Sequence, residues 1–504
     1  MNSPALPQPS TGISGLSGGR APSSARWIAL IVLSLAQLMV ILDSTIVNIA
    51  LPTAQADLAF SNDDRQWVVT GYALAFGSLL LLGGRLSDLF GRKRLFIIGI
   101  VGFAVASAVG GAAVGFDMLL IARVAQGAFA ALLAPAALAL VSVTFADNAA
   151  DRGRAFGVFG AVSGAGGALG LLLGGILTES VSWRWCLYVN LIIAAIALVG
   201  ALIWLREGAR PTRVRLDLPG TITSVLGLVG IVYGLGNAAS AGWTDGWTLG
   251  TSVGGLALLI IFVLIQRRSA NPLLPLGVVL DRTRGAAFLS IGISGIGSFA
   301  VFLFLTYYLE GTLGFTPIQT GIAFLPMVGM LIVGAGAAGA AFMPRFGPRP
   351  LVAIGCTLAA IGMALLTGIG PETTYAAGVL PALLILGLGL GLVFGPAQNA
   401  STSGAKSDEA GVASALVNTA QQIGGSIGTA VFSALAASAI SGYLLDHAAT
   451  AQEAATVTAA TLASDHLVFW IAAGTFLASG IIAALLFRSG PLPVDSDAGP
   501  AIAA

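Results

Sequence analysis

Long apolar runs separated by short polar stretches are the feature that most constrains this 504-residue chain. A helix needs about 20 predominantly apolar residues to cross a bilayer, and within the bilayer its backbone groups must be bonded internally. The sequence therefore predicts an all-α polytopic membrane protein. Fourteen spanning helices are expected, at residues 27–50, 66–87, 95–115, 117–143, 155–178, 185–205, 217–237, 247–266, 286–309, 318–342, 350–368, 375–399, 410–438 and 466–487.

Composition supports this class and argues against others. The chain is 56% hydrophobic and only 9% charged, far from the usual balance of a soluble domain. A net charge of +1 argues against nucleic acid as a partner. Cys186 and Cys356 fall in separate apolar runs, so we expect no disulfide. His447 and His466 fall in a late polar connection with no Cys or acidic cluster nearby, so we expect no metal site.

The basic residues predict how the helices are oriented. With the N-terminus in the cytoplasm, only Arg65 and Arg184 of the 23 Lys and Arg residues fall on the outer side, and Arg123 falls within a helix. A miscounted helix would invert everything downstream and destroy this bias. We therefore expect a multi-pass protein with both termini cytoplasmic. Residues 1–26 are rich in Ser, Pro and Gly and are expected to form a disordered tail.

An internal repeat predicts two related halves. Gly83, Phe90, Gly91, Lys93, Leu95 and Gly99 match Gly339, Phe346, Gly347, Arg349, Leu351 and Gly355 at one offset, and residues 166–170 match 424–428 at nearly the same offset. Chance matches between Gly-rich segments are the alternative. The repeat predicts six-helix bundles at 27–205 and 285–487, a linker at 206–284 that contains the helices 217–237 and 247–266, and a cytoplasmic tail at 488–504. Repeated halves are typical of secondary transporters.

Two ionisable residues lie inside predicted spans, where they are costly and therefore candidates for function. Asp43 either faces a water-filled cavity, where it could exchange a proton or pair with a cationic substrate, or serves as packing between helices. Arg123 either acts on a nearby acid or a transported anion, or it hydrogen-bonds backbone carbonyls. For Asp43 we favour function, because Asn or Ser would pack at lower cost.

Further polar residues lie at helix ends or on one helix face. Glu310 ends the ninth predicted helix on the outer side, either as a second titrating group or as a solvated helix end. Asn418 and Gln422 are four residues apart and share a face of the thirteenth helix, where they could line a cavity or bond across helices. The residues expected to line a substrate cavity are Asn48, Tyr72, Gln126, Tyr307, Tyr308, Asn418 and Gln422.

Two glycine-containing segments are expected to shape the halves. The loop between the second and third helices concentrates charge beside two glycines. Its candidates for a functional role are Gly84, Asp88, Gly91, Arg92, Lys93 and Arg94. The fifth helix is unusually rich in glycine, with a hinge expected at Gly166, Gly170, Gly174 and Gly175. These glycines either allow static close packing or form a contact at which the halves rock. Nucleotide binding is not expected, because the chain has no phosphate-binding loop motif.

These segments together carry a family resemblance. Residues 84–94 resemble the G-x-L-a-D-r-x-G-r-k motif between helices two and three of the major facilitator superfamily. Residues 42–52 resemble the first-helix motif of its fourteen-helix drug:proton antiporters, the EmrB/QacA type. Arg123 with Gln126 and Gly127 resembles that group's fourth-helix motif. Trp183, Arg184, Trp185 and Asn190 resemble its segment before and into helix six, and the resemblance extends over about 27–487.

The resemblance implies a fold, a function and several roles. It implies two six-helix bundles with two inserted helices, and proton-driven export of amphiphilic, cationic drugs by alternating access. In relatives, the residues that match Asp88, Arg92 and Lys93 form a charge-relay latch with the other half. We therefore expect a conformational latch made of Gly84, Asp88, Gly91, Arg92, Lys93 and Arg94. Those that match Asp43 and Arg123 are implicated in proton coupling or substrate binding.

The chain departs from the family pattern at two positions. Leu171 replaces the usual proline of the fifth-helix motif, which weakens the expectation of a bend there. Glu310 stands where relatives commonly carry Gln, so this extra acid could favour cationic substrates or add proton coupling.

Other functions are weighed against proton-driven drug export. One alternative is a narrow exporter of an endogenous metabolite or antibiotic, and another is a membrane sensor or scaffold that does not transport. An enzyme is not expected, because the sequence offers no catalytic constellation. We expect a monomer in a bacterial inner membrane, with protons, lipid and small amphiphiles as partners and no cofactor.

Overall fold

The computed structural model describes residues 23–145, 149–205, 207, 216–269, 272–403, 410–450 and 452–491. The first half consists of α1 (Ser23–Leu58), α2 (Asn62–Phe90), α3 (Arg92–Gly111), α4 (Phe116–Thr144), α5 (Ala149–Ser180) and α6 (Trp185–Trp204). An inserted pair follows, α7 (Leu218–Ala241) and α8 (Gly246–Arg268).

The second half begins with a short helix, α9, which leads into the first spanning helix of this half, α10. Its elements are α9 (Leu276–Leu280), α10 (Arg282–Tyr307), η1 (Tyr308–Thr312), α11 (Pro317–Ala337), η2 (Ala338–Phe342), α12 (Met343–Phe346), α13 (Pro348–Leu366), η3 (Tyr375–Val379), α14 (Leu380–Thr402), α15 (Ala410–Asp446) and α16 (Ala454–Leu486), where η marks a π-helical turn. Thirteen helices in the described part of the chain are long and apolar enough to cross a membrane. The predicted span at 155–178 is the one not among these thirteen, and it corresponds to the 32-residue α5, which contains the shorter apolar segment Leu169–Ser180.

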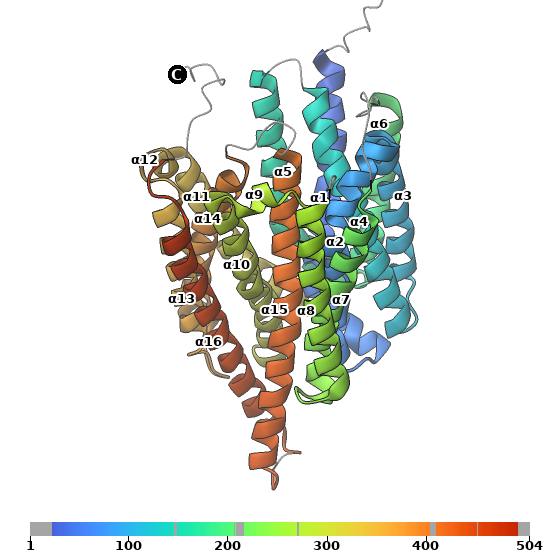
Figure 1. Ribbon diagram of the computed structural model, residues 1–504. Coiled ribbons are helices and arrows are strands. Elements are labelled where there is room, and N and C mark those ends of the chain that lie inside the picture. Colours follow the sequence, from blue (N-terminus) through green and yellow to red (C-terminus); the bar gives the residue numbers. More distant parts are fainter. Residues whose placement is uncertain are drawn as a thin grey trace, which may run out of the picture.

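The structure corrects three expectations about segment ends. α1 begins at Ser23, so residues 23–26 are helical rather than part of a tail; residues 1–22 lie outside the described part. α15 and α16 are longer than the predicted 410–438 and 466–487, and Figure 1 shows their connection extending below the other helices. His466 therefore lies within α16, where its Nε2 is 2.6 Å from the carbonyl oxygen of Ile369. Alanine-rich sequence favours helix even where Ser, Thr and Gln lower its hydropathy, so hydropathy underestimates these helices.

The two halves have the same helix cap and the same turn glycine at equivalent positions. α2 and α11 both begin with a capping box, in which Ser61 and Thr316 accept from the backbone N–H of Asp64 and Gln319. Gly91 and Gly347 open the helices that follow with φ of 102° and 72°, a conformation that favours glycine. The motif glycine is therefore a turn residue in both halves.

Figure 1 shows α3, α4 and α6 on one side of the molecule, α13 and α16 on the other, and α7 and α8 in front between them. α7 packs on both α2 and α15, and α8 packs on α7. Buried Leu74, Val232 and Ala430 join α2, α7 and α15 in one small cluster. The Gln66 side chain also donates to the Gly236 carbonyl at 3.2 Å. The inserted pair thus covers a line along which the two halves meet.

Candidate functional site

The charged residues predicted within the first and fourth helices form an ion pair inside the first half. Asp43 of α1 and Arg123 of α4 are 2.6 Å apart, from the carboxylate Oδ2 to the guanidinium Nη1, and their side chains are 0% and 1% exposed. Buried charges in proteins are paired and hydrogen-bonded, because unpaired ones are too costly to desolvate. The residues that hold this pair therefore define the site.

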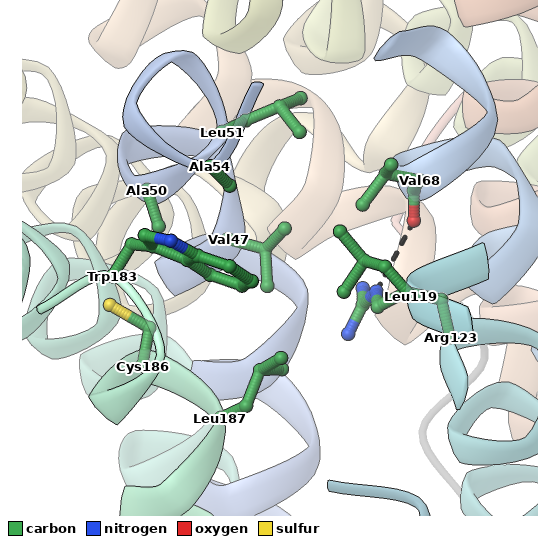
Figure 2. A pocket seen from close by; sticks show the side chains of 10 residues that line it. All are labelled: Val47, Ala50, Leu51, Ala54, Val68, Leu119, Arg123, Trp183, Cys186 and Leu187. Atoms are coloured by element: carbon green, nitrogen blue, oxygen red, sulfur yellow. Dashed lines mark hydrogen bonds between the residues drawn. The ribbon is translucent and has the colours of Figure 1, made fainter. Parts of the chain in front are cut away.

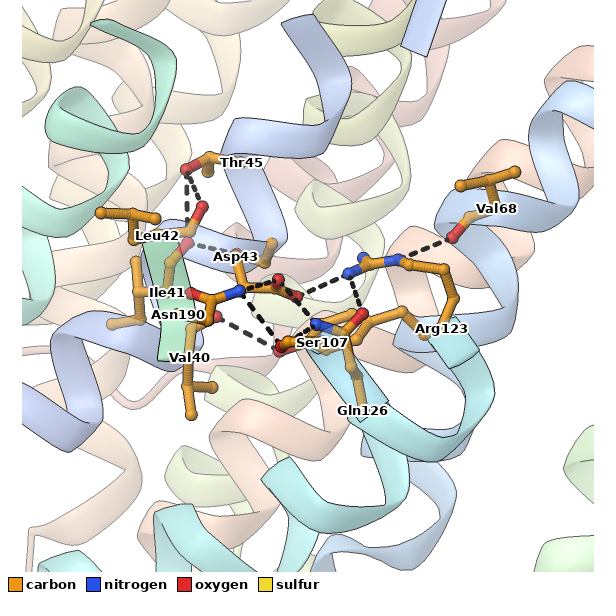
Figure 3. A network of polar contacts seen from close by, with 12 residues as sticks. Val40, Ile41, Leu42, Asp43, Thr45, Val68, Ser107, Arg123, Gln126 and Asn190 are labelled. Carbon is orange, nitrogen blue, oxygen red and sulfur yellow. Dashed lines mark hydrogen bonds and ion pairs between the residues drawn. The ribbon is translucent and has the colours of Figure 1, made fainter. Parts of the chain in front are cut away.

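Amide side chains complete the environment of the Asp43 carboxylate (Figure 3). Gln126 of α4 and Asn190 of α6 donate to its Oδ1 at 3.0 and 2.7 Å. The same two amides also donate to the hydroxyl oxygen of Ser107 on α3, at 2.7 and 3.4 Å. The carboxylate thus accepts from a guanidinium and two amides, which come from two different helices.

Arg123 is held on several sides as well. Its Nε donates to the Val68 carbonyl of α2 at 3.2 Å, and its Nη1 donates to Oε1 of Gln126 at 3.0 Å. The guanidinium carbon lies 4.3 Å from the centre of the Tyr72 ring, a cation–π geometry. The Tyr72 hydroxyl in turn donates to the Val40 carbonyl at 3.2 Å. Arg123 thus pairs with an acid and also bonds a backbone carbonyl, so the contacts that both interpretations require are present, and its role stays a prediction.

This arrangement is suited to a switch driven by one proton. With Asp43 ionised, the pair is neutral overall, and Arg123, Gln126 and Asn190 all donate to an anionic acceptor. A proton on Asp43 would leave the Arg123 charge buried without a counter-ion, which is strongly unfavourable. Protonation must then be accompanied by a rearrangement or by access of water or an anion to Arg123.

The carboxylate faces the interior of the first half rather than an open cavity. Its hydrogen-bond partners come from α4 and α6, and the Ser107 hydroxyl that links them belongs to α3. Leu42 and Ile46 on α1 belong to the same buried apolar cluster as Leu303 and Phe304 of α10. The carboxylate is thus enclosed by polar side chains of its own half in this conformation.

Glu310 lies in a separate group at the end of the molecule away from the termini, which we refer to as the outer end. It belongs to the π-helical turn η1, and its Oε1 is buried without a hydrogen-bond partner in the described part of the chain. In the preceding turn, the Tyr307 ring lies 3.8 Å below the guanidinium carbon of Arg65 from α2. Arg65 and Tyr307 thus bring the two halves into contact at this end.

The remaining residues predicted to line a cavity are dispersed. Asn48 is buried and donates to the Ser44 carbonyl one turn back, at 3.4 Å. Tyr308 is buried inside the second half, and its hydroxyl donates to the Gly370 carbonyl at 2.8 Å. Gln422 packs against Gly77 of α2 where the halves meet, and Asn418 is half-buried one turn earlier on α15. Their role in substrate binding stays a prediction.

The charged residues predicted to form a loop lie instead in the end of α2 and the start of α3, with only Gly91 between the two helices. They make their bonds mainly within the first half. Arg92 pairs with Asp88 at 3.0 Å. Lys93 Nζ donates to two carbonyls at the end of α6, those of Leu202 and Leu205, at 3.2 and 2.7 Å. This segment also reaches the linker, where Arg85 donates to the Pro272 carbonyl at 2.6 Å.

The other latch residues shape this turn. A Cβ on Gly91 would lie 2.9 Å from the Glu207 carboxylate, and Gly84 packs against Pro135 of α4. Arg94 is exposed. A latch to the second half stays a prediction, because the bonds described for Asp88, Arg92 and Lys93 are to residues of the first half and to Glu207 of the linker.

The glycines of α5 allow close contact with α1 and α11. A Cβ on Gly166 would meet Ile41 at 3.1 Å, one on Gly170 would meet the Leu42 carbonyl oxygen at 2.9 Å, and one on Gly174 would meet the Ile46 carbonyl oxygen at 2.8 Å. A Cβ on Gly175 would instead meet Ile318 Cα of α11, at 2.7 Å. Three of the four predicted hinge glycines therefore face α1, and the fourth faces the second half.

Asn190 and Ser107 are parts of the site that sequence reasoning did not assign. Asn190 was noted only within a family motif, and Ser107 carries no signal, because hydroxyls are common in spanning helices. No group of His, Cys, Asp and Glu able to hold a metal occurs among the described residues.

Comparison with known proteins places the chain in a family. Residues 33–429 match the Major Facilitator Superfamily. The chain is 48% identical over 472 residues to the puromycin resistance protein of Streptomyces alboniger, with 93% of each chain covered. It is 36% identical to the cephamycin export protein of Amycolatopsis lactamdurans, over 84% of this chain and 88% of the relative. The chain therefore belongs to the Major Facilitator Superfamily, and it is a membrane transporter rather than an enzyme.

Solved structures support the fold. The POT family transporter PepTSo aligns with a TM-score of 0.66 at 15% identity, over 92% of this chain and 98% of that one. A bacterial homologue of the lysosomal transporter Spinster, in an inward-facing and unoccupied conformation, aligns with a TM-score of 0.62 at 15% identity, over 92% and 98%. The predicted fold class, two six-helix bundles with inserted helices, is confirmed.

Proposed function

We propose that the protein exports an amphiphilic antibiotic in exchange for protons, by alternating access, in a bacterial plasma membrane. The observation that carries this proposal is the fully buried pair of Asp43 and Arg123, enclosed by amide side chains. An ionisable pair at membrane depth is costly, so it needs a role that an apolar contact could not fill.

The pair couples a proton to the shape of the first half. While Asp43 is ionised, it fixes Arg123 and, through Gln126 and Asn190, draws α1, α4 and α6 together. A proton arriving from outside releases Arg123, and the weakened contacts favour the arrangement that lets a substrate leave outward. Loss of the proton to the cytoplasm restores the pair and the inward-facing state. A single group can drive this cycle only because its ion pair differs between the two states.

The relatives favour an antibiotic as the substrate. Their names specify puromycin and cephamycin, and a further relative at 35% identity is the tetracenomycin C resistance and export protein of Streptomyces glaucescens. Since the puromycin resistance protein is the one at 48% identity, puromycin is the first compound to test. A narrow range is thus preferred over the broad one expected from the motifs.

A multidrug exporter is the second candidate. It is favoured by a relative at 32% identity, the multidrug resistance protein Stp of Mycobacterium tuberculosis. The extra acid Glu310 at the outer end would suit several cationic compounds.

The test uses everted membrane vesicles with an acidic interior. Labelled puromycin, cephamycin, tetracenomycin C and a cationic dye are added separately, with and without an uncoupler. Uncoupler-sensitive accumulation of puromycin alone supports the narrow exporter, and accumulation of most compounds supports the multidrug reading. Accumulation that the uncoupler leaves unchanged contradicts proton coupling, and no accumulation of any compound indicates a sensor or scaffold.

A further inference from the structure

A small cavity lies inside the first half beside the ion pair (Figure 2). Its walls are side chains of α1, α2, α4, the segment that leads into α6 and the start of α6 itself, including those of Arg123 and Cys186, and the surface they turn to the cavity is apolar. The space open to the centre of a water molecule is about 10 Å³, roughly what one water needs. The Arg123 side chain thus borders both this cavity and the network around Asp43.

The cavity lies one helical turn from the network on each of three helices. On α1, Val47 of the cavity follows Asp43 by four residues. On α4, Leu119 precedes Arg123 by four residues, and on α6, Cys186 precedes Asn190 by four. Since α1 runs opposite to α4 and α6, all three offsets point toward the same end of the molecule, the outer end.

An exposed ion pair bounds the other side of the cavity. Trp183, which lines the cavity, donates from its indole Nε1 to Asp57 at 2.9 Å. Asp57 also pairs with Arg184 at 2.9 Å, and the two side chains are 47% and 30% exposed. The cavity therefore occupies the short distance between the outer surface of the first half and the buried Asp43.

One buried polar atom of the network still lacks a partner. The Oδ1 of Asn190 is buried and has no hydrogen-bond partner among the described residues, although its Nδ2 binds Asp43. A buried acceptor of this kind is commonly satisfied by an ordered water. Asn190 is one turn from the cavity wall at Cys186, so a water that passes the cavity would find an acceptor next to the carboxylate.

We propose that extracellular protons reach Asp43 through the first half itself, along the cavity between α1, α4 and α6, and not through the space between the two halves. This rests on the proton coupling proposed above. A hydronium at the inner end of the cavity transfers its proton to Asp43, so that one O–H bond of the hydronium breaks, an O–H bond forms on the carboxylate, and water is left. The ionisable and charged groups along this route are Tyr72, Arg123 and Cys186 inside, and Asp57 and Arg184 at its mouth.

The route explains how substrate and proton are kept apart. A substrate leaving between the halves passes α10, a helix of the second half that contacts α1. The proton approaches the opposite side of Asp43, where its hydrogen-bond donors are Arg123, Gln126 and Asn190. A bulky compound in the central space then leaves the proton path open.

The first test fills the cavity. Val47→Phe places a ring in it, and Ile31→Phe on the exposed face of the same helix is the matched control. In proteoliposomes we expect puromycin-driven proton flux to be lost in Val47→Phe and kept in Ile31→Phe, while both variants bind puromycin as the unmodified protein does. Retained binding shows that Val47→Phe is folded. Full proton flux in a Val47→Phe variant that binds puromycin would overturn the route.

The second test uses the native thiol in the cavity and needs no bulky change. In right-side-out vesicles and chloride-free buffer, external Ag⁺, which is close to water in size, replaces the thiol proton of Cys186 and blocks the passage. Cys356 lies in the second half beside Ser294 and is removed in all samples by Cys356→Ser. We expect Ag⁺ to abolish proton flux when Cys186 is present and to leave it unchanged in Cys186→Ser.

The outcomes separate the route from the function on which it rests. Proton flux that resists Ag⁺ with Cys186 in place overturns the route alone. If the unmodified protein shows no puromycin-driven proton flux, proton coupling itself is wrong, and the route fails with it.

Discussion

At the scale of residues, the ion pair of Asp43 and Arg123 adds little net stability to the fold, but removing one of its two partners would destabilise the fold strongly. Replacing a buried ion pair by apolar groups is often neutral, whereas removing one partner leaves an uncompensated buried charge. The carboxylate would keep its two amide donors, from Gln126 and Asn190, but neither carries a compensating charge. The site is thus sensitive to single substitutions.

We predict that Arg123→Ala lowers the free energy of unfolding by about 3–5 kcal/mol, because Asp43 is left buried without a counter-ion. The measurement is denaturant unfolding in detergent, followed by tryptophan fluorescence. The control is Arg92→Ala, which breaks the half-exposed pair with Asp88 and should cost less than about 1 kcal/mol. Equal losses in the two variants would contradict the role assigned to the buried pair.

The sequence revealed the two charged residues but not their contact. Asp43 and Arg123 stand out because ionisable side chains are rare in apolar runs. Their pairing depends on how α1 and α4 are rotated and shifted against each other, which tertiary packing decides. The same holds for Ser107 and Asn190, whose hydroxyl and amide are common in spanning helices and gain meaning only beside the carboxylate.

At the scale of elements, α5 shows how glycine sets the distance between helices. Gly170 faces α1, where the Leu42 carbonyl leaves no room for a methyl group, whereas a Cβ on Gly167 would meet nothing within 4 Å. Small residues that let backbones approach are typical of helix contacts in membranes. The Gly-rich run therefore contains glycines of two kinds: some, such as Gly170, pack against a neighbouring helix, and others, such as Gly167, have open space beside them.

We predict opposite effects for Gly170→Ala and Gly167→Ala. The first forces α5 away from α1 and should lower the free energy of unfolding by about 1–3 kcal/mol, as overpacking does. The second removes a flexible residue from a helix interior and should raise it by about 0.5–1 kcal/mol. Thermal and denaturant unfolding in detergent measures both. A stabilising Gly170→Ala would show that the contact with α1 is looser than described.

Helix positions were largely predictable from hydropathy, and helix ends were not. The extra turns of α15 and the early start of α16 lie in sequence that is helical by propensity but less apolar than a span. The inserted pair was recognised as two helices, but the position of α7 across α2 and α15 depends on contacts such as Gln66 with Gly236. No local pattern encodes contacts across such a separation.

At the scale of the whole molecule, the halves are in close contact at the outer ends of α5 and α11. A Cβ on Gly321 would meet the Leu171 carbonyl at 2.5 Å, and one on Gly175 would meet Ile318 Cα at 2.7 Å. The Glu179 carboxylate also accepts from the Ile318 N–H at 3.2 Å. Alternating access requires this contact to open when the substrate leaves outward.

We predict that Gly175→Leu separates these outer ends, because its side chain cannot fit against α11. Spin labels on the exposed Val181 and Ile322 report the distance between α5 and α11 by pulsed electron paramagnetic resonance. The distance should lengthen in Gly175→Leu and stay as in the unmodified protein in Gly167→Leu. An unchanged distance in Gly175→Leu would mean that the two helices do not limit each other there.

The two-half plan itself was predictable, because the turn glycines Gly91 and Gly347 stand at matching positions of the repeat in the sequence. Both have a positive φ in the structure. Which ends of the halves touch could not be predicted, since a transporter sequence must permit more than one arrangement. The contact of Gly175 with α11 belongs to the arrangement described here.

The central claim is that Asp43 carries the proton that drives export. The direct measurement is puromycin-driven proton flux in proteoliposomes, read by an internal pH dye, for the unmodified protein, Asp43→Asn and Asp245→Asn. Asp245 caps α8, and Asn caps a helix equally well, so this control makes the same chemical change at the surface. We expect normal flux in Asp245→Asn and none in Asp43→Asn. Undiminished flux in Asp43→Asn would show that Asp43 does not carry the proton.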